Sequence, residues 1–162
     1  MKTIHFPTEL WVGEGALANL ETLHDKRVFI VTDPFMVDSG FVNEVTKHLT
    51  KSEWQIFSDI IPDPPIDKIA AGIKQLATFQ GDTILALGGG SAIDAAKAMK
   101  FFAKRTLQTQ IAEFIAVPTT SGNGTEVPNI SVITFDKTGT IIQLATNEIQ
   151  TAVAIFVTTY II

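Results

Sequence analysis

The sequence of 162 residues contains no cysteine. This excludes disulfide bonds and thiolate metal sites, and a reducing compartment such as the cytoplasm is the expected location. The net charge is −5 and no block of basic residues occurs, so nothing favours nucleic acid as a partner. No apolar run approaches the ~20 residues of a membrane-spanning helix, and the first residues lack a signal-peptide pattern. We therefore expect a soluble globular protein with no membrane partner.

Strand-like and helix-like segments alternate about four times along the chain. Short β-branched and aromatic runs predict strands at residues 28–32, 54–60, 83–87 and 114–117, and apolar periodicity predicts helices over 37–49, 66–76 and 92–102. Such alternation is typical of an α/β fold with a mostly parallel sheet and helices on both faces. Residues 131–135 and 140–144, joined by the turn at 136–139, predict a β-hairpin.

The last twelve residues, 151–162, contain no charge, proline or glycine. One interpretation is an atypical apolar tail at a point of truncation, after a domain that spans residues 1–150. An uncovered segment of this kind promotes aggregation. The other interpretation is a final core strand, because a short apolar run does not distinguish the two.

Three consecutive glycines and a serine, Gly88 to Ser91, lie where a predicted strand ends and an alanine-rich helix begins. Glycines let backbone N–H groups approach a ligand closely, and the helix start offers unpaired N–H groups and a positive dipole end. A phosphate or pyrophosphate suits this position. We expect Ser91 to cap the helix, with Asp94 returning a bond to the cap backbone. The alternative is a tight turn that binds nothing.

Two further polar positions follow predicted strands. Asp33 directly follows the first strand, where a carboxylate can accept hydrogen bonds from a ribose and repel a 2′-phosphate, which favours NAD over NADP. Residues 118–126 collect hydroxyls, an amide and glycines after the fourth strand, at the sheet edge where α/β folds bind ligands. The alternatives are an Asp-Pro turn and a surface turn with local hydrogen bonds.

No catalytic or metal-binding group can be argued from the sequence. His5, His24 and His48 are scattered, and no acidic residue stands at ligand spacing from any of them. No Gly-x-Ser-x-Gly motif accompanies a base. We expect neither catalytic residues nor metal ligands within these residues.

The ordered motifs resemble the iron-dependent, or group III, alcohol dehydrogenases. The resemblance is carried by Phe6 to Thr8 with Gly13 to Ala16, by Val31 to Asp33, by Gly88 to Lys97 and by Val117 to Val127. It covers the chain up to about Ala154 and implies a Rossmann-like NAD-binding domain. In the full-length family a helical C-terminal domain supplies an aspartate and three histidines for Fe²⁺ or another divalent metal. That domain and those ligands are absent from this chain.

The resemblance also implies roles for individual residues. Asp33 would meet the adenosine ribose, and Gly89, Gly90 and Ser91 would hold the pyrophosphate in the turn that begins at Gly88. The rest of the cofactor cleft would be lined by Asp63, Asp94, Thr119, Thr120, Asn123 and Val132. Besides the missing metal ligands, two departures from the family pattern occur: no lysine stands near residues 140–142, and Thr151 and Val157 replace a usual proline and acid.

The favoured function is an NAD-linked oxidoreductase homologue that interconverts a primary alcohol and an aldehyde by hydride transfer, here shortened to its cofactor domain and inactive alone. A homo-oligomer is expected. The alternative is a non-catalytic dinucleotide-binding module that self-associates through the N-terminal strand or residues 151–162. A phosphosugar- or nucleotide-binding fold of another family is a third possibility.

Overall fold

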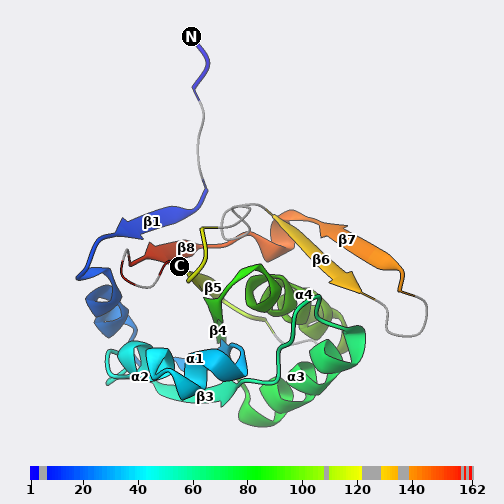
Figure 1. Ribbon diagram of the computed structural model, residues 1–162, viewed down its shortest axis with the longest axis horizontal. Coiled ribbons are helices and arrows are strands. Elements are labelled where there is room, and N and C mark those ends of the chain that lie inside the picture. The colour runs from blue at the N-terminus through cyan, green and yellow to red at the C-terminus, as the bar shows by residue number, and fades with distance from the viewer. Residues whose placement is uncertain are drawn as a thin grey trace.

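Six parallel strands and a separate antiparallel hairpin organise the chain in the computed structural model, which describes residues 1–3, 7–107, 110–121, 129–134, 139–157, 159 and 161 (Figure 1). The strands are β1 (Glu9–Val12), β2 (Arg27–Val31), β3 (Glu53–Phe57), β4 (Thr83–Gly88), β5 (Glu113–Pro118), β6 (Ile130–Thr134), β7 (Ile141–Ala145) and β8 (Val153–Phe156). The helices are α1 (Pro34–Asp38), α2 (Phe41–Thr46), α3 (Ile66–Phe79) and α4 (Gly90–Thr106), with 3-10 turns η1 (Ala16–Thr22) and η2 (Asn147–Ile149).

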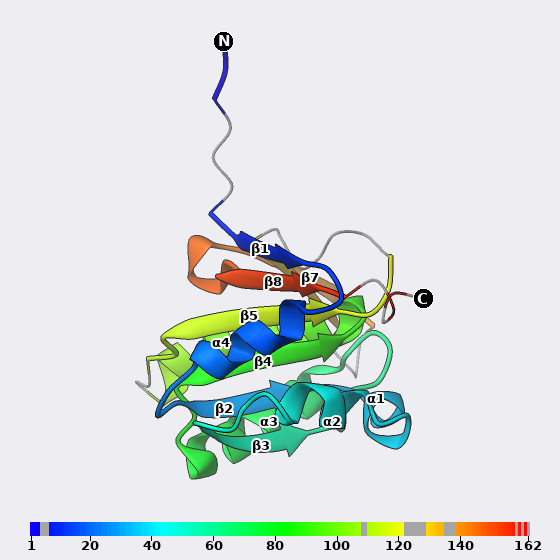
Figure 2. The same ribbon diagram turned by 90° about the vertical axis from the view of Figure 1, so that its left-hand side faces the viewer.

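The large sheet has the strand order β1-β8-β5-β4-β2-β3, and every pairing in it is parallel (Figure 2). The central strands β2, β4 and β5 are buried almost throughout, since both faces of the sheet are covered. This architecture confirms the predicted α/β class with a mostly parallel sheet.

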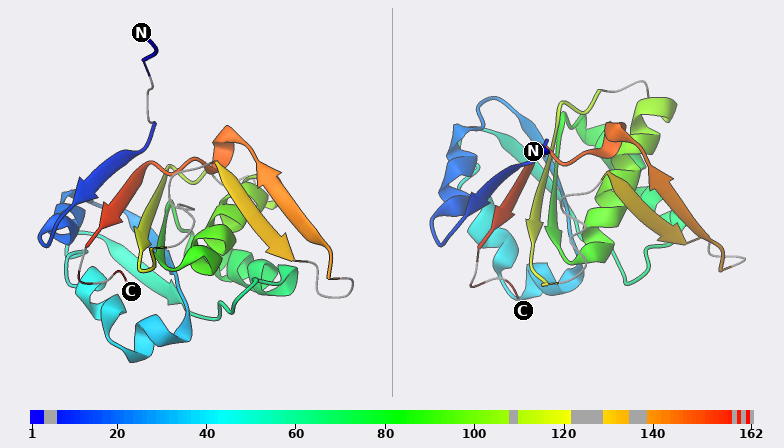
Figure 3. Two further views of the ribbon diagram at one scale, coloured as in Figure 1. Left: turned by 45° about the horizontal axis from the view of Figure 1, so that its top comes forward. Right: turned by 90° about the horizontal axis from the view of Figure 1, so that it is seen from above.

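Two apolar clusters cover the two faces of the sheet. One joins Phe29, Ile84 and Phe114 to the inner sides of α3 and α4. The other joins Val28 and Ile30 to η1, α1 and α2. Alternate residues of β2 point to opposite faces, as the pleat of a strand requires. The helices therefore lie on both faces, as predicted, and the hairpin β6–β7 lies beside α4 (Figure 3).

The helix predicted over residues 37–49 is wrong in detail, because two short helices replace it. Gly40 takes a φ of +84° between α1 and α2, a left-handed conformation that interrupts an α-helix. The first helix also begins earlier, at Pro34, where the fixed φ of proline suits the first helical position.

The ends of the chain lie side by side in the sheet. β1 pairs with β8, from Glu9 with Val153 to Val12 with Phe156, and β8 in turn pairs with β5. Of the two interpretations of the apolar C-terminal residues, the core strand is the correct one for residues 153–156, which form β8. The sheet therefore continues past residue 150, while the division into a domain and a tail stays a prediction.

Other elements differ less from expectation. The hairpin is confirmed with β6 and β7 in antiparallel register, whereas residues 135–138 of its turn fall outside the described residues. The strand predicted at 54–60 ends at Phe57, the N-terminal strand, expected without bounds, is β1, and η1 was not predicted. Within the described residues, none of the helices has the length and hydropathy needed to span a bilayer.

Candidate functional site

The strands that carry the predicted site end at one edge of the sheet, at a reversal of strand order. From β2 the chain passes through α1 and α2 to β3 on one side, and from β4 through α4 to β5 on the other. Such a switch point leaves a crevice outside the carboxyl ends of the strands, where α/β folds bind ligands.

An open cavity of about 570 Å³ lies at this edge. Six predicted site residues line it: Asp33, Gly89, Gly90, Ser91, Thr119 and Thr120. The other lining residues are Pro34, Phe35, Met36, Ile60, Ile61, Pro62 and Ala92. Polar groups from three strand ends thus meet an apolar wall.

The glycine turn brings its backbone close to neighbouring groups. Gly88 has a φ of +144°, and a Cβ there would lie 3.1 Å from the Ala92 Cβ and 3.2 Å from Asp33 Oδ2. A Cβ at Gly89 would lie 3.3 Å from the Thr120 Cγ2 atom. Any side chain at Gly88 would therefore be crowded as well as strained, so only glycine fits the turn.

The predicted capping of α4 by Ser91 is wrong. Gly89 is the N-cap of the helix, and no side chain hydrogen-bonds to it there. Ser91 and Asp94 each lie too far along the helix for the capping roles assigned to them, because the helix begins at Gly90. The first N–H groups of a 17-residue helix are therefore left without a side-chain cap beside the cavity.

Asp33 combines a structural contact with a place in the cavity. Its Oδ1 accepts a hydrogen bond of 3.0 Å from the Met36 N–H, which makes it the N-cap of α1. Its Oδ2 lies next to the Gly88 backbone, at the rim of the cavity. Asp33 can therefore both cap α1 and contact a ligand, since Oδ1 serves the cap and Oδ2 is left for a ligand.

Thr119 lines the same cavity and carries a buried hydroxyl. Its N–H donates to the Gly88 oxygen at 2.9 Å, which fixes the end of β5 against the glycine turn. The side chain is 1% exposed, and its Oγ1 has no hydrogen-bond partner among the described residues. A buried hydroxyl without a partner is costly, so a ligand that supplies one would be favoured. Asn123 lies outside the described residues.

A second cavity of about 310 Å³ adjoins the first through Ser91. The predicted residues Asp63, Asp94 and Val132 line it together with Pro64, Thr134, Gly139 and Ile141. The carboxylate of Asp94 accepts a hydrogen bond from the Val132 N–H, while its Oδ1 has no partner among the described residues. Burial raises the pKa of this carboxyl to about 6, although the Val132 bond and the Lys97 charge act to lower it.

Two contacts fix the hairpin against α4 behind Asp94. The fully buried Lys97 donates a hydrogen bond from Nζ to the backbone carbonyl oxygen of Ile130 at 3.2 Å. Ser131 Oγ donates to the backbone carbonyl oxygen of Asp94 at 2.7 Å. Neither residue was predicted to support the site. A signal for Lys97 exists in the sequence, since it follows Ile93 by four residues and so shares the buried face of the helix.

The sequence over residues 7–158 matches the model of the iron-containing alcohol dehydrogenase family. The chain belongs to this family. A 1-propanol dehydrogenase of Citrobacter freundii is 36% identical over 163 residues, which cover 100% of this chain and 44% of that protein. An NADPH-dependent butanol dehydrogenase of Clostridium saccharobutylicum is 34% identical, over 96% of this chain and 44% of that protein.

Solved structures of similar proteins share the fold. Sulfoacetaldehyde reductase from Bifidobacterium kashiwanohense, in complex with NAD+, superposes with a TM-score of 0.83 at 26% identity, over 96% of this chain and 46% of that one. The chain thus spans less than half the length of these relatives.

Iron-containing dehydrogenases require metal ligands that the described part of this chain does not bring together. No group of three or more histidine, cysteine, aspartate or glutamate side chains that could hold a metal ion occurs there. We therefore assign these residues no step that passes through a metal. Among the described residues, three features of this edge of the sheet could hold a ligand: an uncapped helix start, a glycine turn and two buried oxygen atoms, Thr119 Oγ1 and Asp94 Oδ1, without partners there.

Proposed function

We propose that this chain is the dinucleotide-binding part of an oxidoreductase that interconverts a primary alcohol and an aldehyde. One observation supports the proposed binding site most directly. The uncapped start of α4 and Thr119, whose buried hydroxyl has no partner among the described residues, line the same cavity beside the turn at Gly88. Backbone N–H groups at a helix start bind phosphate groups well, and a pyrophosphate fits this arrangement.

The residues around the turn suggest how the dinucleotide would lie. The pyrophosphate would sit over Gly89, Gly90 and Ser91, and the adenosine ribose would reach Asp33, which lines the same cavity. Asp63, Asp94 and Val132 line the adjoining cavity, which would accommodate the other end of the molecule. The bound dinucleotide supplies the hydride acceptor or donor, and these residues bind and orient it.

We propose NAD rather than NADP as the cofactor. The Asp33 carboxylate would repel a 2′-phosphate, whereas it can accept hydrogen bonds from the ribose hydroxyls. The relatives differ on this point, since one is named as NADPH-dependent and another is solved with NAD+. The charge at residue 33 therefore supports the choice for this chain. A cytoplasmic homo-oligomer is part of the same proposal.

Calorimetric titration with NAD tests the binding site. Replacing Ser91→Glu puts a negative charge in the first turn of α4, which stabilises a helix but repels a phosphate. We expect this variant to fold normally and to bind NAD at least about tenfold more weakly, because two like charges a few ångströms apart cost about 1–4 kcal/mol. Ser91→Ala is the matched control and should bind NAD with little loss. Unchanged affinity in Ser91→Glu would refute the assignment.

The catalytic part of the proposal has a separate test. The chain is mixed with NAD, Fe²⁺ or Zn²⁺ and a series of small primary alcohols, and NADH absorbance is followed. We expect NAD binding with no turnover by these 162 residues, since no group among the described ones could hold a metal. Turnover by the chain alone would exclude the alternative of a non-catalytic dinucleotide-binding module. Turnover by a longer protein that contains this chain would support the proposed oxidoreductase.

A further inference from the structure

A cavity of about 340 Å³ lies at the opposite edge of the sheet from the candidate dinucleotide site. Three segments of the chain line it: Lys100 and Lys104 of α4, Gln110 and Ile111 before β5, and Asn147 and Glu148 of η2. The parallel strands β5 and β8 begin at this edge, and η2 packs there against α4 (Figure 3). Lys100 comes ten residues after Gly90, which is about 15 Å along the axis of an α-helix, so the two cavities are separate.

Positive charges outnumber negative ones around this cavity. Glu148 is the one acid among the described residues that line it, and both of its oxygens already have partners. Oε2 accepts a hydrogen bond of 2.8 Å from Arg105 Nη1, and Oε1 lies 3.5 Å from Lys104 Nζ. One carboxylate is thus set against three cations, Lys100, Lys104 and Arg105, which leaves two positive charges in excess.

The helix end accounts for two of these cations but not for Lys100. Lys104 and Arg105 lie in the last turn of α4, where the negative end of the helix dipole favours positive charge, and both pair with Glu148. Lys100 lies one turn earlier and has no acid or other acceptor among the described residues. Burial lowers the pKa of its ammonium group below the ordinary value, and the charge of Lys104 adds to this effect. An anion in the cavity would compensate for the water that this cation has lost.

The side-chain amides at the cavity supply further donors. Asn147 Oδ1 accepts a hydrogen bond of 2.9 Å from Asn129 Nδ2, which orients the amide and leaves Asn147 Nδ2 to donate. Gln110 adds a second amide to the lining. The volume of about 340 Å³ lies at the lower end of the range of about 300–1,000 Å³ for small-molecule sites. A small ligand with two negative charges and several acceptor oxygens suits this combination.

We propose that this cavity binds a small dianion that carries a phosphate group, held between the ammonium groups of Lys100 and Lys104 and beside the Asn147 amide. A phosphate group brings nearly two negative charges and several acceptor oxygens on one centre, which matches the excess of cations and the amide donors. Lysine binds phosphate as a point charge, through charge-assisted hydrogen bonds. Inorganic phosphate and a small phosphate monoester share this chemistry. The inference does not depend on dinucleotide binding at the other edge, and the two can fail separately.

Two-dimensional NMR of the amide groups in the ¹⁵N-labelled chain tests the site, because it reports on the two ends of α4 separately. Sodium phosphate is titrated over about 0.1–30 mM, which brackets millimolar dissociation, and sodium chloride keeps the ionic strength constant. We expect saturable shifts at the amides of Ile111, Asn147 and Glu148. Phosphate at the start of α4 would instead shift Gly90 and Ser91. Shifts confined to that end would overturn the proposal.

The variant Lys100→Met keeps the apolar part of the side chain and removes its charge. It should weaken phosphate binding at this cavity about tenfold or more and leave any shifts at Gly90 and Ser91 unchanged. Lys104→Gln, at an exposed position, should also weaken binding, which guards against a folding defect in Lys100→Met. The matched control is Lys74→Met, which removes a lysine of α3 beside a different cavity and should leave binding unchanged. Undiminished binding in Lys100→Met, or an equal loss in the control, would overturn the assignment.

The Lys100 ammonium group offers an independent readout. A bound phosphate should raise the pKa of Lys100 toward its ordinary value, because a nearby anion favours the charged form. The pKa is measured by NMR from a pH titration of ¹³C-labelled lysine side chains, with and without phosphate, and Lys100→Met identifies the signal. A pKa that saturating phosphate leaves unchanged would overturn the proposal.

A second titration, with glycerol 3-phosphate, distinguishes the two sources of the phosphate group. Tighter binding than that of inorganic phosphate, with larger shifts at Ile111, would assign the cavity to a phosphate monoester. Equal or weaker binding would assign it to inorganic phosphate. Saturation of the same amides by sodium chloride alone would show that the cavity does not select a dianion, and would overturn the proposal.

Discussion

The carboxyl group of Asp94 is partly buried between α4 and the hairpin, and its elevated pKa makes a direct prediction about stability. In the folded chain the pKa is about 6, against an ordinary value of 3.8. A carboxyl whose pKa rises on folding stabilises the fold most when it is protonated. This contribution is therefore complete below about pH 3.8 and is lost as the pH rises through about 6.

The magnitude follows from the same two values. A rise from 3.8 to about 6 corresponds to about 3 kcal/mol at neutral pH. Since Asp94 lines a cavity that is open to solvent, screening reduces this to about 1–2 kcal/mol. Asp94→Asn removes the ionisable group and keeps an oxygen that can accept from the Val132 N–H. The variant should therefore be more stable than the unmodified chain by about 1–2 kcal/mol at pH 8.

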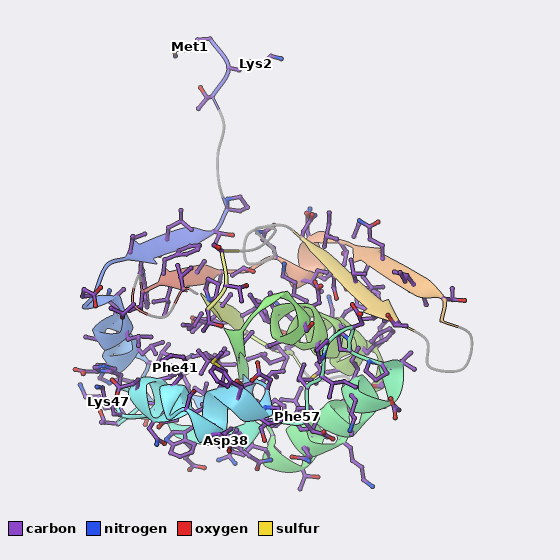
Figure 4. All side chains as sticks on the ribbon, viewed as in Figure 1. Met1, Lys2, Asp38, Phe41, Lys47 and Phe57 are labelled. Atoms are coloured by element: carbon purple, nitrogen blue, oxygen red, sulfur yellow. The ribbon has the colours of Figure 1, made fainter. Side chains whose placement is uncertain are left out.

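Urea unfolding followed by tryptophan fluorescence at pH 4 and at pH 8 provides the assay. The stability difference between Asp94→Asn and the unmodified chain should be large at pH 8 and should mostly disappear at pH 4. Asp38→Asn, at an exposed carboxylate on α1, is the control and should change stability by less than about 0.5 kcal/mol at either pH (Figure 4). A destabilised Asp94→Asn at pH 8, or a gain equal at both pH values, would refute the reasoning.

Three further predictions, each about a single feature, can be checked by the same unfolding assay or by titration. Gly88→Ala should lower the free energy of unfolding by more than about 2 kcal/mol, because the strain of a positive φ adds to crowding. Gly40→Ala, with open space around it, should lower the free energy of unfolding by only about 1 kcal/mol. Equal losses of stability in the two variants would contradict this reasoning. Thr151→Val should raise the free energy of unfolding by about 1 kcal/mol, since the buried Thr151 hydroxyl has no partner among the described residues. Thr8→Val removes a 2.7 Å hydrogen bond to the Thr151 backbone oxygen and should lower the free energy of unfolding by a similar amount. A loss of stability in Thr151→Val would count against the reasoning about the buried hydroxyl. Asp33→Ser keeps an N-cap for α1 and removes the charge, so the affinity for NADP should rise about tenfold with little change in stability. Unchanged discrimination between NAD and NADP would show that another residue selects the cofactor.

Local sequence patterns were sufficient for the central elements and for the place of the site. The runs that form β2, β4 and β5 are apolar almost throughout, because strands covered on both faces have no polar side. The glycine turn and the polar positions after strands could be placed at one edge of the sheet, since parallel strands end together. The break at Gly40 was also visible as a weak point, although its consequence, two helices in place of one, was not predicted.

Other features depend on residues that are far apart in the chain. The bounds of the N-terminal strand β1 could not be predicted because four residues at an edge carry little pattern of their own, and their partner strand begins at Val153. The apolar end could be assigned to the core only once β1 and β5 were seen on either side of it. The cap of α4 was misplaced by two residues, since the start of a helix after three glycines is decided by packing rather than by propensity.

The sequence by itself therefore determined the α/β class, the order of the central strands along the chain and the family, because those depend on local periodicity and on motifs. Only the tertiary structure decided which polar atoms are buried without a partner and which strand is left at the open edge. Burial and edge position are properties of contacts between distant segments. Thr119, Asp94 and β1 acquire their chemistry from those contacts and show none of it in their own neighbourhoods of the sequence.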